Sequence, residues 1–399
     1  MTIFSRDEYE SRIHAAQERM QQQGIDTLIL TDPANINYLT GYDGWSFYVP
    51  QAVVVSQALS EPLWIGREQD SNGARLTCWM SESAITPYAD YFIQSSVRHP
   101  MDYVAEVVKS HSLDHGRIGV EMDAYYFSAF SYQRLVQALP DARFSDATLL
   151  VNWIRLVKSE HEIALIQQAA SVVTLAMDTA MGVIRPGVRE PDAAAEILRT
   201  QIQGTSEIGG DYPAIVPLIP SGVRTSSAHL TWVDRRYEVG DTVNIELAGC
   251  VKRYHCPLAR SAVIGIAPPH LTDLAKVVVE GVNAALEAVK PGHVCEDVEA
   301  AWQHVIQHYG YSKASRLGYS VGLNYPPDWG EHTASLRAGD RTELQANMVF
   351  HMIAGMWMDG YGLEVSETFR VIPSGVETMT CVERKLFVLQ EPEISVLGA

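Results

Sequence analysis

The sequence has little lysine, and no apolar run of membrane-spanning length is apparent in it. Seven lysines accompany 23 arginines, and the 48 acidic residues bring the formal net charge to -18. A strongly acidic surface repels phosphate backbones and anionic lipid headgroups, so we expect neither nucleic acid nor a membrane as a partner. The N-terminal residues, Met1–Glu8, are polar and charged, which does not match a signal peptide.

Cysteine is also scarce. The five cysteines are an odd, scattered set with no C-x-x-C spacing. This usage is typical of free thiols in a reducing cytoplasm, where we expect the protein to be located. The composition, 47% hydrophobic and 20% charged over 399 residues, is that of a soluble globular chain long enough for two domains.

The two parts of the chain have different patterns. Short apolar runs alternate with helical stretches in the first part, which predicts an α/β domain over residues 1–155. The second part, residues 156–399, contains an internal duplication: Ile184–Gly187, with Asp192 after it, recurs 105 residues later as Val289–Gly292, with Asp297 after it. Each copy joins two predicted helices across a Pro-Gly turn, which indicates a domain of two similar α+β halves.

Residues 242–265 read TVNIELAGCVKRYHCPLARSAVIG and predict a strand hairpin, because two β-branched and apolar runs flank a polar turn. This hairpin, the Pro-Gly repeats and the segment around His229 resemble the creatinase/prolidase/methionine aminopeptidase family, the pita-bread enzymes. The resemblance covers nearly the whole chain. It implies a creatinase-like protein in which an α/β N-terminal domain precedes an α+β pita-bread domain with internal duplication, and it implies a homodimer.

In that family five side chains hold a pair of metal ions. The corresponding positions in this sequence are Glu246, Pro257, Tyr319, Ile353 and Ser366. Divalent cations in oxygen-rich sites need several carboxylates or imidazoles together, and only one carboxylate remains here. We therefore expect no metal ion and no other cofactor.

Three residues are the candidates for catalysis. His229 follows a Ser221-Gly222 turn, where the family places a histidine near the substrate, and histidine is the residue type best suited to proton transfer near neutral pH. Glu246 lies on one face of its strand, where it could bind a cation, activate water or attack as a nucleophile; the structural alternative is a buried ion pair with Arg260. Glu364 lies two residues before Ser366 and therefore on the same face of the strand. Glu367 lies three residues after Glu364 and therefore on the opposite face, so the two glutamates cannot both point inward.

A larger set of residues is predicted to bind the substrate. Aromatic faces attract cations, and polar groups near the vacant ligand positions can orient a small molecule. In creatinase-type dimers the region that corresponds to Trp45 reaches the partner's active site. Arg260, Arg224 or Tyr48 is expected to hold a substrate carboxylate. The predicted binding residues are Trp45, Phe47, Tyr48, Tyr254, His255, Arg260, Tyr319, His351 and Trp357.

The resemblance and the lost ligands together imply a metal-independent hydrolase that cleaves a C–N bond in a small cationic or zwitterionic cyclic amidine. Water attack assisted by His229 and attack by a glutamate are both open mechanisms. Three alternatives also remain: a creatinase-like hydrolase of another amidine or guanidine, a prolidase-type metallopeptidase, and a domain that binds proteins without catalysis.

Overall fold

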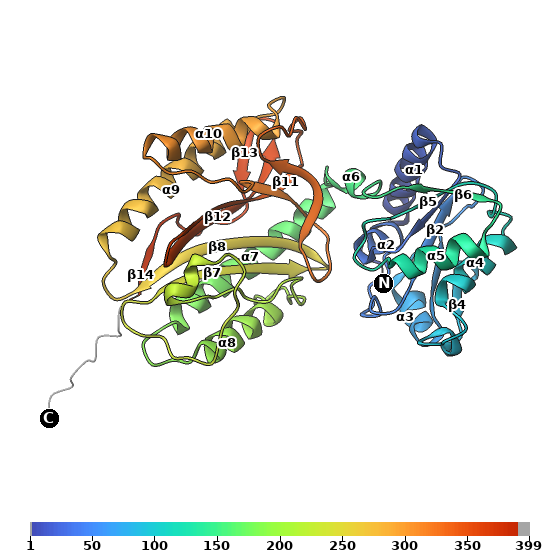
Figure 1. Cartoon of the computed structure of the whole chain (residues 1–399), viewed down its shortest axis with the longest axis horizontal. Helices are drawn as coiled ribbons and strands as arrows, with labels where there is room; N and C mark the ends of the chain where they lie inside the picture. Colours follow the sequence, from blue (N-terminus) through green and yellow to red (C-terminus); the bar gives the residue numbers. More distant parts are fainter. Residues whose placement is uncertain (1, 390–399) are drawn as a thin grey trace. The chain divides into compact units, whose positions relative to one another are not determined.

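A computed structural model describes residues 2–389. The chain divides between Arg155 and Leu156 into two compact units, an N-terminal and a C-terminal domain (Figure 1). Each domain has its own sheets and its own buried core.

The N-terminal domain is built on a mixed six-stranded sheet with the strand order β4-β3-β2-β1-β5-β6. The central strand β1 pairs antiparallel with β2 and parallel with β5. Every residue of β1 and β2 is buried, which explains why both read as continuous apolar runs. The strands are β1 (Thr27–Leu30), β2 (Ala52–Ser56), β3 (Leu63–Arg67), β4 (Ile85–Tyr88), β5 (Gly116–Val120) and β6 (Ala142–Asp146).

Helices connect these strands, so the domain is α/β as predicted. The first helix begins after Ser5, whose side chain accepts a hydrogen bond from the Glu8 amide, and it ends at Gly24 in a left-handed conformation. The helices are α1 (Arg6–Gln23), α2 (Pro33–Thr40), α3 (Ser71–Thr77), α4 (Pro100–Ser110), α5 (Ala129–Ala138) and α6 (Asn152–Arg155), with short 3-10 turns η1 (Glu68–Asp70), η2 (Glu82–Ala84) and η3 (Asp90–Phe92).

The C-terminal domain shows the predicted duplication. A long helix, a Pro-Gly turn and a 14-residue helix occur twice, and Gly187 and Gly292 both take positive φ angles, 83° and 86°, in these turns. The predicted capping box of Ser159 and Glu162 is present at the start of the first long helix. The helices are α7 (Glu160–Val183), α8 (Glu190–Gln203), α9 (Pro269–Ala288) and α10 (Cys295–His308), with the 3-10 turn η4 (Gly222–Ser226).

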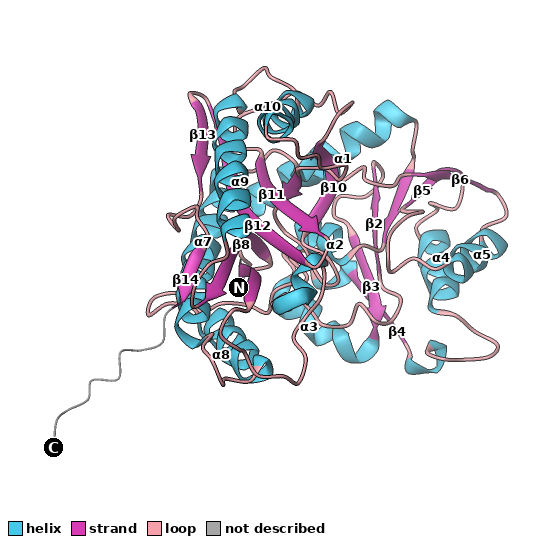
Figure 2. Cartoon of the chain, turned by 60° about the vertical axis from the view of Figure 1, so that its left-hand side comes forward, coloured by secondary structure: helices cyan, strands magenta, loops and turns pink. Residues whose placement is uncertain are grey.

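The strands of this domain lie between the two helix pairs (Figure 2). Their orders are β10-β9-β11-β12-β13 and β14-β8-β7, and the predicted hairpin is β7-β8, with a turn at Lys252 and Arg253. The Ala259 amide of β8 donates to Ser366 Oγ of β12 at 2.6 Å, which joins the two sheets. The strands are β7 (Thr242–Val251), β8 (Tyr254–Ile264), β9 (Gly318–Val321), β10 (Gly330–Leu336), β11 (Val349–Met358), β12 (Tyr361–Ile372), β13 (Gly375–Thr378) and β14 (Phe387–Leu389).

Helix α7 differs from the expectation that apolar runs fall short of a membrane span. It is long and apolar enough to cross a bilayer by length and composition, and half of its most apolar window is buried within the protein. The helix packs closely on the β7-β8 hairpin: a Cβ added at Gly249 would lie 1.9 Å from the Ala169 carbonyl oxygen. The apolar length of α7 therefore reflects its position in the core of the domain.

Candidate active site

The positions that hold metal in the resembled family share one face of the C-terminal sheets. Glu246 lies opposite Ala259, and Ile353 lies opposite Ser366. Tyr319 of β9 pairs with His351 of β11, two residues from Ile353 and on the same face. The strand register thus assembles a common face, although the side chains on it differ from metal ligands.

The donor set on this face does not fit the metal pair of the resembled family. Proline and isoleucine offer no side-chain donor atom, and the Ser366 hydroxyl already bonds to His351 and to the Ala259 amide. Within residues 2–389, no three or more His, Cys, Asp or Glu side chains are grouped so as to hold a metal ion. No chemical step below is assigned to a metal.

Two buried carboxyl groups, Glu246 and Glu364, lie on this face close enough for their charges to interact. Burial, together with the charge of Glu364, raises the pKa of Glu246 well above its usual range. Burial also raises the pKa of Glu364 to about 7. No residue in the described part of the chain donates a hydrogen bond to either carboxyl group. Buried carboxyls without protein partners are uncommon outside functional sites, so this pair marks the candidate site.

Aromatic and basic side chains surround the two carboxyls. The Tyr319 hydroxyl accepts a hydrogen bond of 2.9 Å from Trp329 Nε1, and the Arg316 guanidinium lies 4.3 Å from the Tyr319 ring centroid. The Trp357 ring lies across Gly355, where an added Cβ would be 1.7 Å from it. Lys313 Nζ lies 5.6 Å from the centroid of that ring. An aromatic wall beside carboxylates suits a flat organic cation.

Sequence reasoning missed Lys313, Arg316 and Trp329. Lys313 and Arg316 precede β9, and Trp329 precedes β10, so no strand alternation identifies the side on which they lie. Their short distance along the chain from Tyr319 is the one signal that could have identified them. Burial lowers the pKa of Lys313 to about 8, while the charge of Glu364 opposes that shift.

The two histidines predicted to bind the substrate occupy different environments. His351 Nε2 lies 2.8 Å from Ser366 Oγ, and its ring packs edge-on against Tyr319, so it contacts the candidate site. Burial lowers its pKa to about 3, which keeps the ring neutral at pH 7. His255 Nε2 accepts a hydrogen bond of 2.9 Å from the Ala214 amide, and burial also lowers its pKa to about 3. The contact made by His255 is with backbone.

Tyr254 and Arg260, both predicted to bind substrate, make structural contacts. Tyr254 donates a 2.8 Å hydrogen bond to Glu162 at the start of α7. Arg260 pairs with Glu367 at 2.6 Å, not with Glu246, which overturns the alternative pairing considered from the sequence. All five N–H donors of Arg260 have protein acceptors, so it has none left for a substrate carboxylate. Besides Glu367, the acceptors are the carbonyls of Ala259, Ser366, Val382 and Glu383.

The buried Arg260–Glu367 pair leads to a stability prediction. Arg260→Met leaves the Glu367 carboxylate buried with only Arg384, 3.4 Å away, and we expect the free energy of unfolding to fall by about 3 kcal/mol. The double variant Arg260→Met/Glu367→Gln removes the uncompensated charge and should recover part of this loss. Urea unfolding of the three proteins measures the difference. Equal stability of the single variant and the unchanged protein would contradict the prediction.

His229 lies in an exposed turn and makes no hydrogen bond or ion pair with any described residue. The segment before it is anchored beside Glu246: the Leu218 and Glu246 backbones exchange two hydrogen bonds of 3.0 and 2.9 Å. Thr225 Oγ1 then accepts from the Gly362 amide of β12 at 3.1 Å. The loop that carries His229 therefore starts between the two strands that hold Glu246 and Glu364.

The predicted aromatic group of the N-terminal domain lies in the segment between α2 and β2. Trp45 and Tyr48 are 56% and 67% exposed, while Phe47 is buried and its ring centroid lies 4.9 Å from that of Trp45. Phe47 also contacts Tyr126 edge-on. A role for Trp45, Phe47 and Tyr48 in substrate binding stays a prediction.

The duplicated helix pairs and the strands between them form a pita-bread domain, and an α/β domain precedes it. Residues 164–373 match metallopeptidase family M24, residues 12–157 match the creatinase/prolidase N-terminal domain, and the chain belongs to this family. It is 42% identical over 392 residues to the ectoine hydrolase of Halomonas elongata, with 96% of this chain and 98% of the relative covered. An uncharacterized hydrolase/peptidase of Sinorhizobium fredii is also 42% identical, over 385 residues, with 96% and 98% covered.

A solved prolidase from Thermococcus sibiricus has the same fold. Its TM-score is 0.83 at 19% identity, with 96% of this chain and 99% of that chain covered. The predicted fold class is thereby confirmed, and the chain is an enzyme of a hydrolytic family.

Proposed function

We propose that this protein opens the ring of ectoine, a cyclic amidine, by hydrolysis to N-acetyl-2,4-diaminobutyrate, and that it does so without a metal ion. The observation that carries this proposal is the pair of buried carboxyls, Glu246 and Glu364, that have no protein donor and lie beside aromatic rings. The name of the 42% identical relative from Halomonas elongata supports the choice of substrate. The residues at the five ligand positions, which retain one carboxylate, support metal independence.

The charge of the pocket fits an amidinium ion. Two neighbouring buried carboxyls do not readily ionise together, because the anion formed at one of them opposes ionisation of the other. The anion balances the planar cation, and the Trp357 ring offers a flat face to stack against it. A cation bound there favours ionisation of both glutamates, so substrate and carboxylates stabilise each other.

Of the partners that the sequence suggested for the substrate carboxylate, the two arginines are already engaged, and Tyr48 stays a prediction. Arg260 has no donor left, and Arg224 donates to Glu190 and to the Thr231 carbonyl. The cations beside the candidate site are Lys313 and Arg316. We assign the attraction of the substrate carboxylate to their positive charges.

Ring opening needs one water molecule, and both of its protons end on the ring nitrogen that departs. The water oxygen forms a bond to the amidine carbon while His229 takes a proton from it, which gives a tetrahedral intermediate. The C–N bond to one ring nitrogen then breaks. The same histidine returns its proton to that nitrogen, and the hydroxyl of the intermediate gives up its remaining proton to the same nitrogen as the amide carbonyl forms, so the nitrogen leaves as an ammonium group. In the alternative route, a Glu246 oxygen bonds to the amidine carbon, and the C–N bond to one ring nitrogen breaks as that nitrogen takes a proton from His229. Water then attacks the same carbon, and the bond to the Glu246 oxygen breaks, which releases the amide and restores the carboxylate. The nitrogen that departs decides which acetyl isomer is produced.

The test of the function is turnover of ectoine by protein treated with a chelator and checked for residual metal. Nuclear magnetic resonance of the product reports ring opening and the position of the acetyl group. Creatine and an Xaa-Pro dipeptide with Mn²⁺ are assayed in parallel as the creatinase-like and prolidase-type alternatives. Turnover of either one in place of ectoine, or activity only after metal is restored, would overturn the proposal.

The proposal predicts a pH effect at Lys313. The positive charge of Lys313 lowers the pKa of Glu364, so Lys313→Met should raise that pKa above about 7. If Glu364 acts as the anion, kcat/KM falls on the acid side of its pH profile as Glu364 is protonated. In Lys313→Met this acid limb should move to higher pH by about one unit, which corresponds to about 1.4 kcal/mol of charge interaction. Lys276→Met, an exposed lysine on α9, is the control and should leave the limb in place. An unchanged limb in Lys313→Met would contradict the role of Glu364.

We also propose a homodimer in the cytoplasm. The support is the family resemblance for the dimer and the set of five free cysteines for the reducing compartment. Analytical ultracentrifugation tests the first statement, and a sedimentation coefficient of a monomer at micromolar concentration would contradict it. Fractionation of the source cells tests the second.

A further inference from the structure

The loop from Ser221 to Arg235 carries His229 near its centre, and the tip of the loop is exposed. His229 itself makes no hydrogen bond with described residues, so its own contacts do not fix its orientation. Ordering the backbone of a segment costs about 1–2 kcal/mol per residue in conformational entropy. A proton-transferring side chain on such a loop therefore needs an anchor elsewhere.

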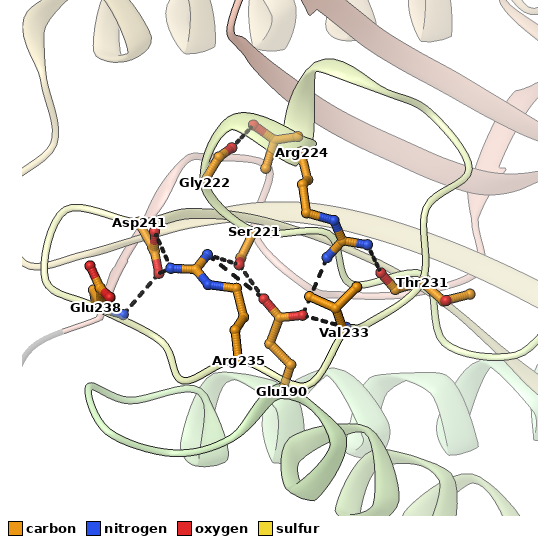
Figure 3. Close-up of polar contacts among 10 residues, drawn as sticks. Glu190, Ser221, Gly222, Arg224, Thr231, Val233, Arg235, Glu238 and Asp241 are labelled. Atoms are coloured by element: carbon orange, nitrogen blue, oxygen red, sulfur yellow. Dashed lines mark hydrogen bonds and ion pairs between the residues drawn. The ribbon is translucent and has the colours of Figure 1, made fainter.

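Glu190, the first residue of α8, contacts both arms of this loop (Figure 3). Its side chain is fully buried. Oε1 accepts a short hydrogen bond from the Ser221 hydroxyl, which precedes His229. Oε2 accepts from the Val233 amide at 2.8 Å, which follows His229, and from Arg224 Nη1 at 3.3 Å. One carboxylate thus joins the two ends of the loop.

Two arginines brace the same loop around Glu190. Arg224 Nη2 donates to the Thr231 carbonyl at 2.6 Å, across the turn that holds His229. Arg235 Nη1 donates to Ser221 Oγ at 2.6 Å, and Arg235 Nη2 donates to Asp241 at 2.9 Å. The arginines neutralise the buried carboxylate, and their hydrogen bonds connect the two ends of the loop to each other and to Asp241, just before β7.

We propose that Glu190 is a positioning residue for His229: its carboxylate closes the base of the 221–235 loop and so holds the imidazole where a proton can pass to and from the substrate. This inference rests on the proposed function, in which His229 transfers the proton. The alternative is that Glu190 only stabilises the start of α8. That alternative predicts a change in stability without a selective change in kcat.

The test variant is Glu190→Gln, which keeps the size of the side chain. An amide has one acceptor oxygen and places N–H donors against donors from the loop, so it can satisfy only part of the cluster. We expect hydrogen exchange of the 221–235 backbone to quicken by about tenfold or more, and kcat for ectoine to fall by about 10²-fold, with KM changed far less. Glu196→Gln, an exposed position on the same helix, is the matched control and should match the unchanged protein.

A second variant keeps the proposal testable if Glu190→Gln does not fold. Arg224→Gln removes the brace to Thr231 and leaves the contacts of Glu190 with Ser221 and Val233, so we expect a smaller loss of kcat, about tenfold, with faster exchange confined to the loop. Unchanged exchange in both variants, or faster exchange with unchanged kcat, would overturn the proposal. Exchange is measured without substrate, so it still tests the anchoring of the loop if ectoine proves not to be the substrate.

Discussion

His229→Ala is expected to lower kcat for ectoine by about 10²–10⁴-fold, the usual contribution of a positioned general acid-base group. The protein should keep its fold, because His229 is exposed and makes no hydrogen bond or ion pair with described residues. Surface changes of this kind usually alter the free energy of unfolding by less than about 0.5 kcal/mol. Steady-state kinetics and thermal unfolding measured on the same sample separate the two effects.

A matched control for this variant is His304→Ala, which removes an exposed histidine from α10 in the same domain. It should leave both kcat and the unfolding temperature unchanged. Added imidazole should restore part of the activity of His229→Ala and none in a variant that lacks a carboxyl group. If His229→Ala keeps more than a tenth of the unchanged activity, another group transfers the proton, and the assignment is wrong.

Glu246→Gln is expected to lower kcat/KM by about 10³-fold, because the variant can neither balance the amidinium charge nor attack as a nucleophile. The same change should stabilise the protein. Burial and the charge of Glu364 raise the folded-state pKa of Glu246 well above its unfolded value. The folded protein therefore binds more protons than the unfolded chain between those two values, so the ionisable group lowers stability progressively as the pH rises through that window.

The measurement is chemical unfolding of Glu246→Gln and the unchanged protein at pH 5 and pH 8. The stabilising effect of the variant should be larger at pH 8, where the carboxyl of the unchanged protein has more tendency to ionise. Glu287→Gln, an exposed position on α9, is the control and should show neither effect. A loss of stability that accompanies the loss of activity would show that Glu246 has a structural role.

The sequence predicted the frame of the site because the frame depends on local patterns. Strand alternation and the Pro-Gly repeats are read directly from the chain, and they placed Glu246 and Glu364 on the face that the structure shows. Strand alternation also separates Glu364 from Glu367, as the sequence indicated. Glu364 lies on the face of the candidate site, and Glu367 pairs with Arg260.

Side-chain contacts between residues far apart in the sequence could not be predicted in the same way. Four of the five Arg260 donors end on β12 and on residues 382 and 383, more than 100 positions away, and nothing local in the sequence specifies those acceptors. Glu190 could be read as an acidic residue at a helix start, but its contacts with Ser221 and Val233 depend on how the loop returns to α8. Irregular segments carry such contacts, and periodicity gives no information about them.

Gly355 has a consequence for how this pocket could change over evolutionary time. The Trp357 ring lies flat because no side chain stands between it and the strand; the methyl group of alanine would overlap the ring. One nucleotide substitution in a glycine codon produces alanine, and that single step would tilt the indole and reshape the surface that a flat cation stacks against. A single substitution at Gly355 could therefore change which substrates the pocket accepts. The carboxyls of Glu246 and Glu364 would both remain in place.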